Sequence, residues 1–343
     1  MLYNIPIESL DERYSAQWNK IFPEEFKKRN INFTTIYPEP LDNKINTGKF
    51  LDIIGTNYFK SKQLTEICQL LNEGKVKDGD IFFFHDLWFP GIEMLFYMRD
   101  ALGINFKIAG MLHAGTYDEY DFLAQEGMEK WGEDLEKSWF KGLDFIFVAT
   151  HFHKDLLEKT GRIDYHTRNK VYVTGFPLPV HIKLTEDDYE KKENIVVFPH
   201  RLDDEKNPQE FDILKCRLEG EYPDWEFIYT KEKCKTKQEY YELLKRAKIA
   251  LSFSEQETWG IAQQEAFMSG CIPIVPNRLS YPEMYGLNFL YEDGVYEAIK
   301  KVKYAIKNYD TIRREIYFSH NIEELKFSSH CAILNMITMM GVS

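Results

Sequence analysis

Short runs of apolar residues alternate along this chain with longer stretches in which apolar residues recur every three to four positions. The short runs predict buried strands, the longer stretches predict amphipathic helices, and their alternation is typical of βα units around parallel sheets. In the first half, helices are expected at 62–71 and 128–140. Strands are expected near residues 1–5, 32–37, 80–85, 106–112, 145–149 and 170–174.

A polar segment at 175–188 interrupts this pattern and predicts a linker, because Gly175, Pro177 and Pro179 fix the direction of the chain. The pattern resumes beyond it and becomes mostly helical from about 293 to 340. Further strands are expected at 194–199, 225–230, 249–253 and 271–275. Two doubly wound domains with a cleft between them are the simplest architecture, and ligands of such sheets bind beyond the carboxyl ends of the strands.

Length and composition support two domains. A chain of 343 residues exceeds the usual size of one domain, and 44% hydrophobic residues with 15% aromatic residues allow two substantial cores. The net charge of -12 argues against unselective coating of polyanions, although a local basic groove could still bind nucleic acid.

The cysteines and the N-terminus bear on the compartment. The five cysteines form no CxxC pair, which favours reduced thiols over a disulfide framework or a zinc site. The N-terminal residues lack the basic start and apolar run of a signal peptide, and no stretch approaches the roughly 20 apolar residues of a membrane span. We therefore expect a cytoplasmic protein, in the host cytoplasm if a phage encodes it, with no membrane partner.

The segment 251–285 is the most informative for function. Its pattern predicts a strand, a loop, a helix and a second strand, with Glu257 in the loop and Glu265 on the helix. Two carboxylates at a strand's carboxyl edge can accept hydrogen bonds from the vicinal hydroxyls of a sugar and of a ribose. Glutamates eight residues apart are usually surface residues. However, Glu265 interrupts an apolar helix, and Gly260 would let a phosphate approach the N–H groups at the start of that helix.

A second cluster follows the strand expected at 194–199. Arg201 and Lys206 lie in the loop after this strand, where a guanidinium fork and an ammonium could neutralise a diphosphate. The alternative is a solvated loop in which these cations accompany Asp203 and Asp204. Both alternatives are open for the loop alone, and its co-occurrence with the two glutamates favours the diphosphate.

The segments HRLDDEKNP and EQETWGIAQQEAFMSGCIPIVPN together resemble the donor half of the retaining, family 4-like GT-B glycosyltransferases. Members of that family carry Arg and Lys after the first strand of the C-terminal domain, a Glu-x7-Glu motif and a Gly-x-Pro element, which is similar to 270–275 here. The run from His200 to Phe211 and the run from Gly270 to Glu283 are closest to the tRNA-queuosine mannosyltransferase type. Phage glycosyltransferases that modify nucleobases also have GT-B architecture.

The resemblance implies the GT-B form of the α/β class, in which two Rossmann-like domains face a central cleft. The implied boundaries are 1–180 for an acceptor-side domain and 181–324 for a nucleotide-sugar-binding domain. A C-terminal helix, at about 325–343, is expected to pack back on the first domain.

The resemblance also implies roles for single residues. Glu265 would bind the ribose of a UDP- or GDP-linked sugar, Glu257 would bind the transferred sugar, and Arg201 with Lys206 would hold the diphosphate. No metal and no cofactor beyond the nucleotide sugar is implied, because these side chains do the work of a divalent cation. No protein nucleophile is implied either, since the departing phosphate can assist the incoming hydroxyl on the same face. The implied donor-binding residues are Arg201, Lys206, Glu257, Thr258, Trp259, Gly260, Ile261 and Glu265.

The first domain departs from the family pattern. Many relatives have a glycine-rich loop after the first strand, whereas residues 6–15 here contain no glycine. Arg13 and Tyr14 could face the cleft at the start of a helix. Equally, Asp11 and Glu12 could cap that helix and complement its dipole.

Two histidines follow strands in this domain. His113 is the better catalytic candidate, because small and polar residues come after it, and by the resemblance it would touch the sugar near the reacting carbon. His85, Asp86 and Trp88 would form a wall for the acceptor, and Asp86 or Asp118 could polarise the acceptor hydroxyl. The alternative for each histidine is a residue satisfied within the core.

The favoured acceptor is a modified base in nucleic acid, either in hydroxymethylated phage DNA or in tRNA. Two basic clusters, 231–237 and 300–307 with Arg313 and Arg314, could follow phosphates, although lysines on helices are usually solvated. Aromatic residues that could stack an extruded base, or belong to the core instead, are Trp88, Phe89, Tyr117, Tyr120 and Phe122. The alternatives are a transferase for a saccharide or small molecule, a nucleotide-sugar epimerase, and a non-catalytic protein that binds a sugar nucleotide.

Overall fold

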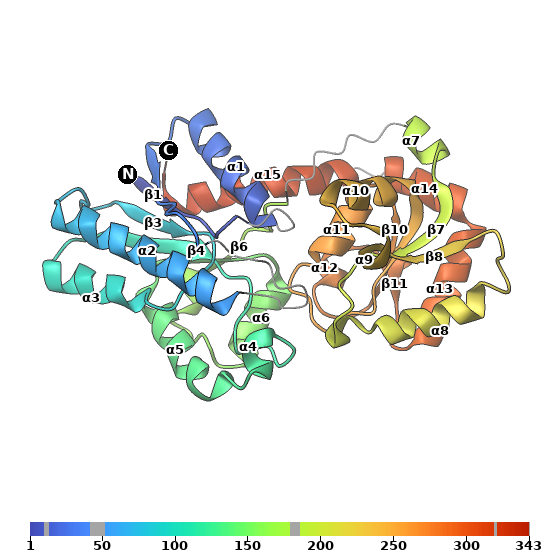
Figure 1. The fold of residues 1–343 in the computed structure, drawn as a ribbon, viewed down its shortest axis with the longest axis horizontal. Helices are drawn as coiled ribbons and strands as arrows, with labels where there is room; N and C mark the ends of the chain where they lie inside the picture. The colour runs from blue at the N-terminus through green and yellow to red at the C-terminus, as the bar shows by residue number, and fades with distance from the viewer. Residues whose placement is uncertain (10–13, 42–51, 179–185, 319–320, 343) are drawn as a thin grey trace. The chain divides into compact units, whose positions relative to one another are not determined.

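The computed structural model describes residues 1–9, 14–41, 52–178, 186–318 and 321–342 (Figure 1). The chain divides into two compact units, and each is described here by itself. The first comprises residues 1–179 with 331–343, and the second comprises residues 180–330. Among the described residues, no helix combines the length and apolar character that a membrane span requires.

The first unit is built on a parallel sheet of six strands among its described residues, in the order β2-β1-β3-β4-β5-β6. The strands are β1 (Leu2–Ile5), β2 (Phe33–Thr35), β3 (Ile81–Phe84), β4 (Lys107–Met111), β5 (Phe145–Val148) and β6 (Val171–Val173). Every residue of β3, with the sequence IFFF, is buried. Such continuous apolar runs are typical of parallel strands covered on both faces.

Helices connect these strands and pack around the sheet (Figure 1). They are α1 (Tyr14–Lys28), α2 (Ile53–Asn72), α3 (Glu93–Leu102), α4 (Phe122–Gln125), α5 (Glu129–Gly142), α6 (His151–Lys159) and the 3-10 turn η1 (Arg168–Lys170). Side-chain caps fix where several of them begin. Asp52 accepts hydrogen bonds from the N–H groups of Ile54 and Gly55, and Thr150 accepts one from the N–H of His153.

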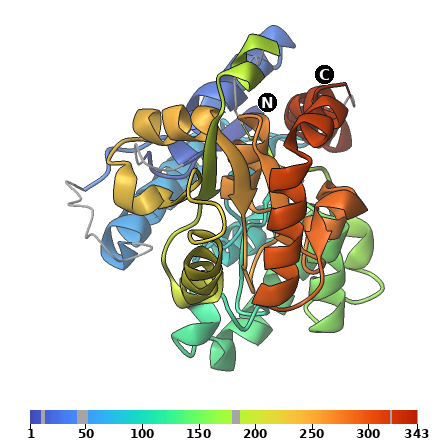
Figure 2. The same cartoon turned by 90° about the vertical axis from the view of Figure 1, so that its right-hand side faces the viewer.

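The second unit, which faces the viewer in Figure 2, has a parallel sheet of five strands within its described part. The strand order is β11-β10-β9-β7-β8. The strands are β7 (Glu193–Phe198), β8 (Glu226–Tyr229), β9 (Ala247–Leu251), β10 (Ile272–Pro276) and β11 (Leu290–Tyr291). The helix α10 packs against α11, and α13 packs against α8. The helices are α7 (Glu186–Glu190), η2 (Asp204–Lys206), α8 (Pro208–Leu218), α9 (Thr230–Lys233), α10 (Lys237–Arg246), α11 (Ile261–Met268), α12 (Tyr281–Met284), η3 (Leu287–Phe289), α13 (Val295–Lys307) and α14 (Tyr309–Phe318). The last helix, α15 (Asn321–Met340), begins in this unit, and its residues from 331 on belong to the first unit.

The strands expected from the sequence are all present, with ends that differ by a residue or two. The structure adds one strand that the sequence did not predict, β11, which is only two residues long. The helical tail is confirmed as α13, α14 and α15. Part of the expected linker, 179–185, lies outside the described residues.

Parallel pairing brings loops that are distant in sequence to one edge of each sheet. In the second unit β7 pairs with β9, so the loop after Phe198 and the loop after Leu251 lie next to each other. In the first unit β3 pairs with both β1 and β4, so the segments after Ile5, Phe84 and Met111 share an edge. Most of the predicted site residues that the structure describes follow strands at these two edges.

Candidate functional site

The buried Lys206 and the partly buried Glu257 form an ion pair at the carboxyl edge of the second sheet. The Lys206 ammonium lies 3.0 Å from Oε1 of Glu257 and donates a second hydrogen bond of 2.6 Å to the carbonyl of Gln256. The N–H of Glu255 donates to the carbonyl of Glu205, which ties the loop after β7 to the loop after β9. An ammonium has three protons, so Lys206 keeps one N–H for a further acceptor.

His200 lies beside this ion pair and was not predicted as a site residue. It is buried, and its Nδ1 lies 3.7 Å from Oε1 of Glu257. Burial, together with the charges of Lys206 and Arg201, holds the pKa of His200 well below its usual value, so the ring is neutral at pH 7. Its Nε2 has no hydrogen-bond partner among the described residues. The signal in the sequence was its position directly after a strand and before Arg201.

Arg201 is exposed in the same loop, with its guanidinium bound by two carboxylates of that loop. One nitrogen lies 2.6 Å from Asp203 and another lies 3.0 Å from Glu205. The sequence left open that Arg201 pairs with carboxylates of its own loop, and the structure shows such pairing. Its partners are Asp203, as considered there, and Glu205 instead of Asp204. A diphosphate would have to exchange with these carboxylates to bind the guanidinium.

Gly260 shapes the backbone between the two predicted glutamates. Its φ of +75° is left-handed, and a Cβ atom there would lie 3.1 Å from the ring of Tyr281. Tyr281 is fully buried and shares a hydrogen bond of 2.8 Å with Ser252 at the end of β9, so the ring cannot easily move. A glycine is needed here on both counts. The turn leads directly into α11, whose first N–H groups point out of the helix.

Glu265 is buried on α11 and is held by two residues of α10. Its Oε1 accepts hydrogen bonds from the ammonium of Lys237 at 2.6 Å and from the hydroxyl of Tyr241 at 2.7 Å. The ammonium also lies over the rings of Tyr240 and Tyr241, at 4.7 Å and 4.9 Å from their centroids. Lys237 was predicted only as part of a phosphate-binding cluster, so this contact was missed. Thr236 and Glu239 form a capping box around it, which fixes where α10 begins.

In the first unit, His113 follows β4 and lies among aromatic rings. Its Nε2 lies 2.7 Å from the carbonyl of His85, which can only accept, so Nε2 carries the proton. The hydroxyl of Tyr14 then donates to Nδ1 at 3.2 Å. Burial is the main reason that the pKa of His113 is lowered. His113 is therefore a neutral imidazole in one fixed tautomer.

His85 lies in the core, which is the alternative that the sequence left open for it. It is fully buried, and its Nε2 donates a hydrogen bond of 2.8 Å to the amide oxygen of Asn4. Burial lowers the pKa of His85 to about 3. Its side chain has no exposed surface, and its carbonyl accepts the hydrogen bond that orients His113.

The other acceptor-side candidates are distributed over the same edge. Asp86 pairs with Lys60 at 3.2 Å and accepts a hydrogen bond from the N–H of Trp88. The indole of Trp88 donates to Oε1 of Glu136, and Asp118 accepts from the N–H of Tyr120. Tyr14 is partly buried against His113, while Arg13 lies outside the described residues.

Glu136 anchors the loop that follows His113. Its carboxylate is almost fully buried and accepts hydrogen bonds from the N–H and the hydroxyl of Thr116, at 2.6 Å and 2.9 Å. Arg162 balances the charge at 3.0 Å. A Cβ atom on Gly115 would overlap the ring of Tyr117 and approach Glu136, so this loop has one close-packed conformation.

Several of the residues proposed to contact nucleic acid are already engaged within the protein. Phe89 and Tyr117 are buried, whereas Tyr120 is exposed. In the basic clusters several cations pair with carboxylates, which reduces the charge left for phosphates. These pairs are Lys300 with Glu297, Lys303 with Glu221, and Arg313 with Glu190 and Asp310.

Comparison of the sequence with known proteins gives a partial match. No protein-family model matches the chain. A tRNA-queuosine alpha-mannosyltransferase of Drosophila melanogaster is 31% identical over 130 residues, a match that takes in 31% of this chain and 34% of that protein. The match therefore spans about a third of the relative's length.

Solved structures match over nearly the whole chain at low sequence identity. Sucrose-phosphate synthase from Thermosynechococcus elongatus has a TM-score of 0.69 at 11% identity, covering 98% of this chain and 97% of that one. The catalytic domain of starch synthase IV from Arabidopsis thaliana, bound to ADP and acarbose, has a TM-score of 0.61 at 10% identity, covering 97% and 99%. With its two parallel sheets amid helices, this chain has the GT-B fold of these glycosyltransferases, as the resemblance of its motifs predicted.

Proposed function

We propose that this chain is a glycosyltransferase that moves a sugar from a nucleoside diphosphate to a hydroxyl group of an acceptor. The observation that carries the proposal is the arrangement of Lys206, Glu257 and Glu265 around one edge of a parallel sheet. They lie on both sides of a left-handed glycine turn that opens a helix. Starch synthase IV, which shares the fold, binds ADP, in keeping with a nucleotide donor.

In this proposal each end of the donor meets a different carboxylate. Glu265, held by Lys237 and Tyr241, accepts hydrogen bonds from the ribose hydroxyls, and Glu257 accepts them from the transferred sugar. Lys206, with its remaining N–H, and Arg201 bind the diphosphate and stabilise the charge that develops as it leaves. Because these cations neutralise the leaving group, the proposal requires no metal.

The proposed reaction retains the configuration of the anomeric carbon. The bond from this carbon to the diphosphate oxygen breaks, a bond to the acceptor oxygen forms on the same face, and the acceptor proton passes to the departing phosphate. In this proposal the neutral His113, whose two ring nitrogens bond to the carbonyl of His85 and the hydroxyl of Tyr14, brings no charge of its own to the reaction. Determining the anomeric configuration of the product by NMR tests this step, and an inverted product would contradict it.

The acceptor we favour is a modified base in tRNA, which places the reaction in the cytoplasm. The partial match to the tRNA-queuosine alpha-mannosyltransferase supports a tRNA base over a base in phage DNA. A saccharide acceptor is the second candidate, because sucrose-phosphate synthase and starch synthase IV share the fold over nearly the whole chain. The internal pairing of Lys303 and Arg313 also leaves fewer free cations for a polyanion.

Mass spectrometry of nucleosides tests this proposal. Total tRNA and, separately, hydroxymethylated DNA would be incubated with the protein and a panel of UDP- and GDP-sugars, then digested. We expect a hexose or pentose mass on one tRNA nucleoside, and no such mass with Glu257→Gln. Loss of donor without any acceptor would instead identify an epimerase. An oligosaccharide product without a nucleoside adduct would move the acceptor to the saccharide class.

A further inference from the structure

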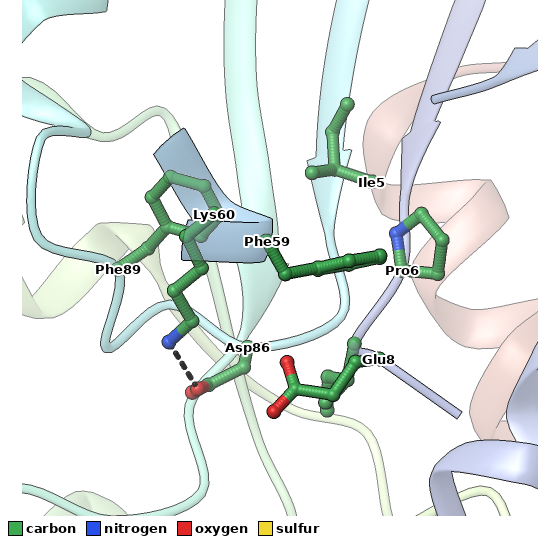
Figure 3. A pocket seen from close by; sticks show the side chains of 8 residues that line it. Ile5, Pro6, Glu8, Phe59, Lys60, Asp86 and Phe89 are labelled. Carbon is green, nitrogen blue, oxygen red and sulfur yellow. Dashed lines mark hydrogen bonds and ion pairs between the residues drawn. The ribbon is translucent and has the colours of Figure 1, made fainter. Parts of the chain in front are cut away.

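A small cavity lies at the carboxyl edge of the first sheet, in the unit that does not carry the predicted donor residues. It has a volume of about 10 Å³, close to the room that one water or one hydroxyl oxygen needs. Its walls come from the end of β1, from α2 and from the segment after β3 (Figure 3). Phe59 and Phe89 form apolar walls, and the polar side chains that reach it are Glu8, Lys60 and Asp86.

Glu8 supplies a buried acceptor to this cavity. The residue is 4% exposed, and its Oε1 accepts a hydrogen bond from the hydroxyl of Thr56 on α2. Its Oε2 is buried and has no hydrogen-bond partner among the described residues. In Figure 3 the carboxylate is turned toward the side of the cavity that holds Asp86. A buried carboxylate oxygen without a donor costs stability, so the site is built for a group that donates a hydrogen bond.

Lys60 supplies the complementary donor. Its ammonium is buried and uses two protons, one for the carbonyl of Trp88 at 2.6 Å and one for Asp86 at 3.2 Å. The third proton is left for a further acceptor. The face of the Phe89 ring lies 5.3 Å from this nitrogen, so the ammonium is enclosed by an apolar wall on one side.

A hydroxyl group matches this cavity in both size and hydrogen bonding, because it donates one hydrogen bond and accepts another. We propose that the cavity is a subsite that binds a hydroxyl group of the acceptor, with Glu8 as its acceptor and Lys60 as its donor. The inference rests on the proposed transferase activity and adds to it a substrate class, namely acceptors with a hydroxyl other than the one that reacts. A carboxylate or phosphate group on the acceptor would be repelled by Glu8 and Asp86.

The position of the cavity is consistent with this role. The charges of Asp86 and Lys60 both act on the pKa of His113, in opposite directions, so the cavity lies within electrostatic reach of that imidazole. Glu8 belongs to the loop after β1, which carries no glycine in this chain. At this edge of the first sheet a glycine would expose the backbone, whereas Glu8 places a carboxylate there.

A graded set of substitutions tests the subsite with total tRNA as the acceptor. In Glu8→Gln the side chain keeps an oxygen acceptor without the charge, and we expect the acceptor KM to rise about threefold. In Glu8→Leu no acceptor remains, and we expect a rise of about thirtyfold. Lys60→Met should act like Glu8→Leu. Affinity for UDP or GDP, measured by calorimetry, should stay within about twofold in all three variants, and the exposed Glu39→Gln serves as the matched control.

Two outcomes of the kinetics would overturn the subsite. Folded Glu8→Leu with an unchanged acceptor KM would show that the cavity holds only a structural water. An equal loss of nucleotide affinity and acceptor affinity would show a general structural defect. Thermal unfolding of each variant identifies any that do not fold.

Crystals soaked in glycerol decide the question even if tRNA is not the acceptor. We expect a glycerol hydroxyl within hydrogen-bond distance of Glu8 Oε2 and Lys60 Nζ. A water that stays in the cavity while glycerol is excluded would contradict the proposal. Absence of transfer to tRNA together with a bound hydroxyl would reject the proposed acceptor and keep the subsite.

Discussion

The ammonium of Lys237 lies 2.6 Å from Oε1 of Glu265, although Lys237 occupies the first position of α10. The start of a helix carries a partial positive charge, so a cation there is unfavourable by itself. The buried carboxylate on α11 offsets this cost, and the rings of Tyr240 and Tyr241 enclose the ammonium. Lys237 therefore holds the carboxylate that we propose binds the donor ribose.

Lys237→Met should weaken both folding and nucleotide binding. The variant leaves Glu265 buried with the Tyr241 hydroxyl but without its cation, and because Lys237 is about a third exposed we expect a loss of only about 1–2 kcal/mol in unfolding free energy. Calorimetry should show affinity for UDP or GDP reduced about tenfold. Urea unfolding measures the first effect, and the exposed Lys235→Met is the control. Equal nucleotide affinity in both variants would show that Lys237 does not contribute to binding of the donor.

Glu257→Gln and Glu265→Gln should separate the two ends of the donor. Loss of the Glu265 charge should weaken the binding of free UDP or GDP by about 1–3 kcal/mol. Loss of the Glu257 charge frees the Lys206 ammonium, so affinity for the free nucleotide should hold or rise, while affinity for the nucleotide sugar and kcat fall. Calorimetry with nucleotide and with nucleotide sugar makes the comparison, with the exposed Glu232→Gln as control. The reverse pattern would exchange the roles of the two glutamates.

Local patterns were sufficient to predict the sheets. Continuous apolar runs such as the IFFF of β3 are typical of strands covered on both faces, so the positions of the strands along the chain were predictable. The strand β11 was missed because two residues at a sheet edge carry no periodicity. The positions of Lys206 and Glu257 were also predictable, since each follows a strand and neighbouring parallel strands end at one edge.

Contacts between elements could not be predicted in the same way. Nothing near Lys237 shows that it turns toward α11, because the packing of α10 on α11 is a tertiary contact. The burial of His85 was equally hidden, since a histidine after a strand fits either the core or a site. Its partner Asn4 is distant in sequence. The cavity at Glu8 depends on three segments that only the folded sheet brings together.

The buried His85 should make stability depend on pH between 7 and 5. Its folded pKa of about 3 lies below the ordinary value of 6.5, so at pH 5 the unfolded chain binds a proton that the folded chain does not, and stability falls as the pH falls. The loss from this group is about 2 kcal/mol over that range. Asp121 acts in the opposite direction, because burial raises its folded pKa to about 7 and the folded state takes up its proton first.

Substitution isolates the histidine from these other groups. His85→Gln can keep a donor to Asn4 but cannot titrate, so its deficit in unfolding free energy should shrink by about 2 kcal/mol between pH 7 and pH 5. Urea unfolding of wild type and variant at both pH values gives the difference. A deficit that stays constant with pH would mean that His85 titrates normally in the folded protein.

Lys192 should be among the most important single side chains for the stability of the second unit. Its buried ammonium lies within 3.3 Å of the carbonyl oxygens at the ends of two helices, Leu244 and Lys245 of α10 and Ser269 after α11. Lys192→Met leaves these carbonyls without a donor, and we expect a loss of about 2–4 kcal/mol in unfolding free energy at pH 7, against almost none for the exposed Lys191→Met.

The same lysine should make stability depend on pH. Burial lowers the pKa of Lys192 in the folded protein below its ordinary value of 10.5. Between these two pKa values the unfolded chain holds a proton that the folded chain has lost, so wild-type stability should rise with pH. The deficit of Lys192→Met in unfolding free energy should therefore grow from pH 7 toward pH 10. Urea unfolding at both pH values measures this deficit, and a smaller deficit at pH 10 would contradict the account.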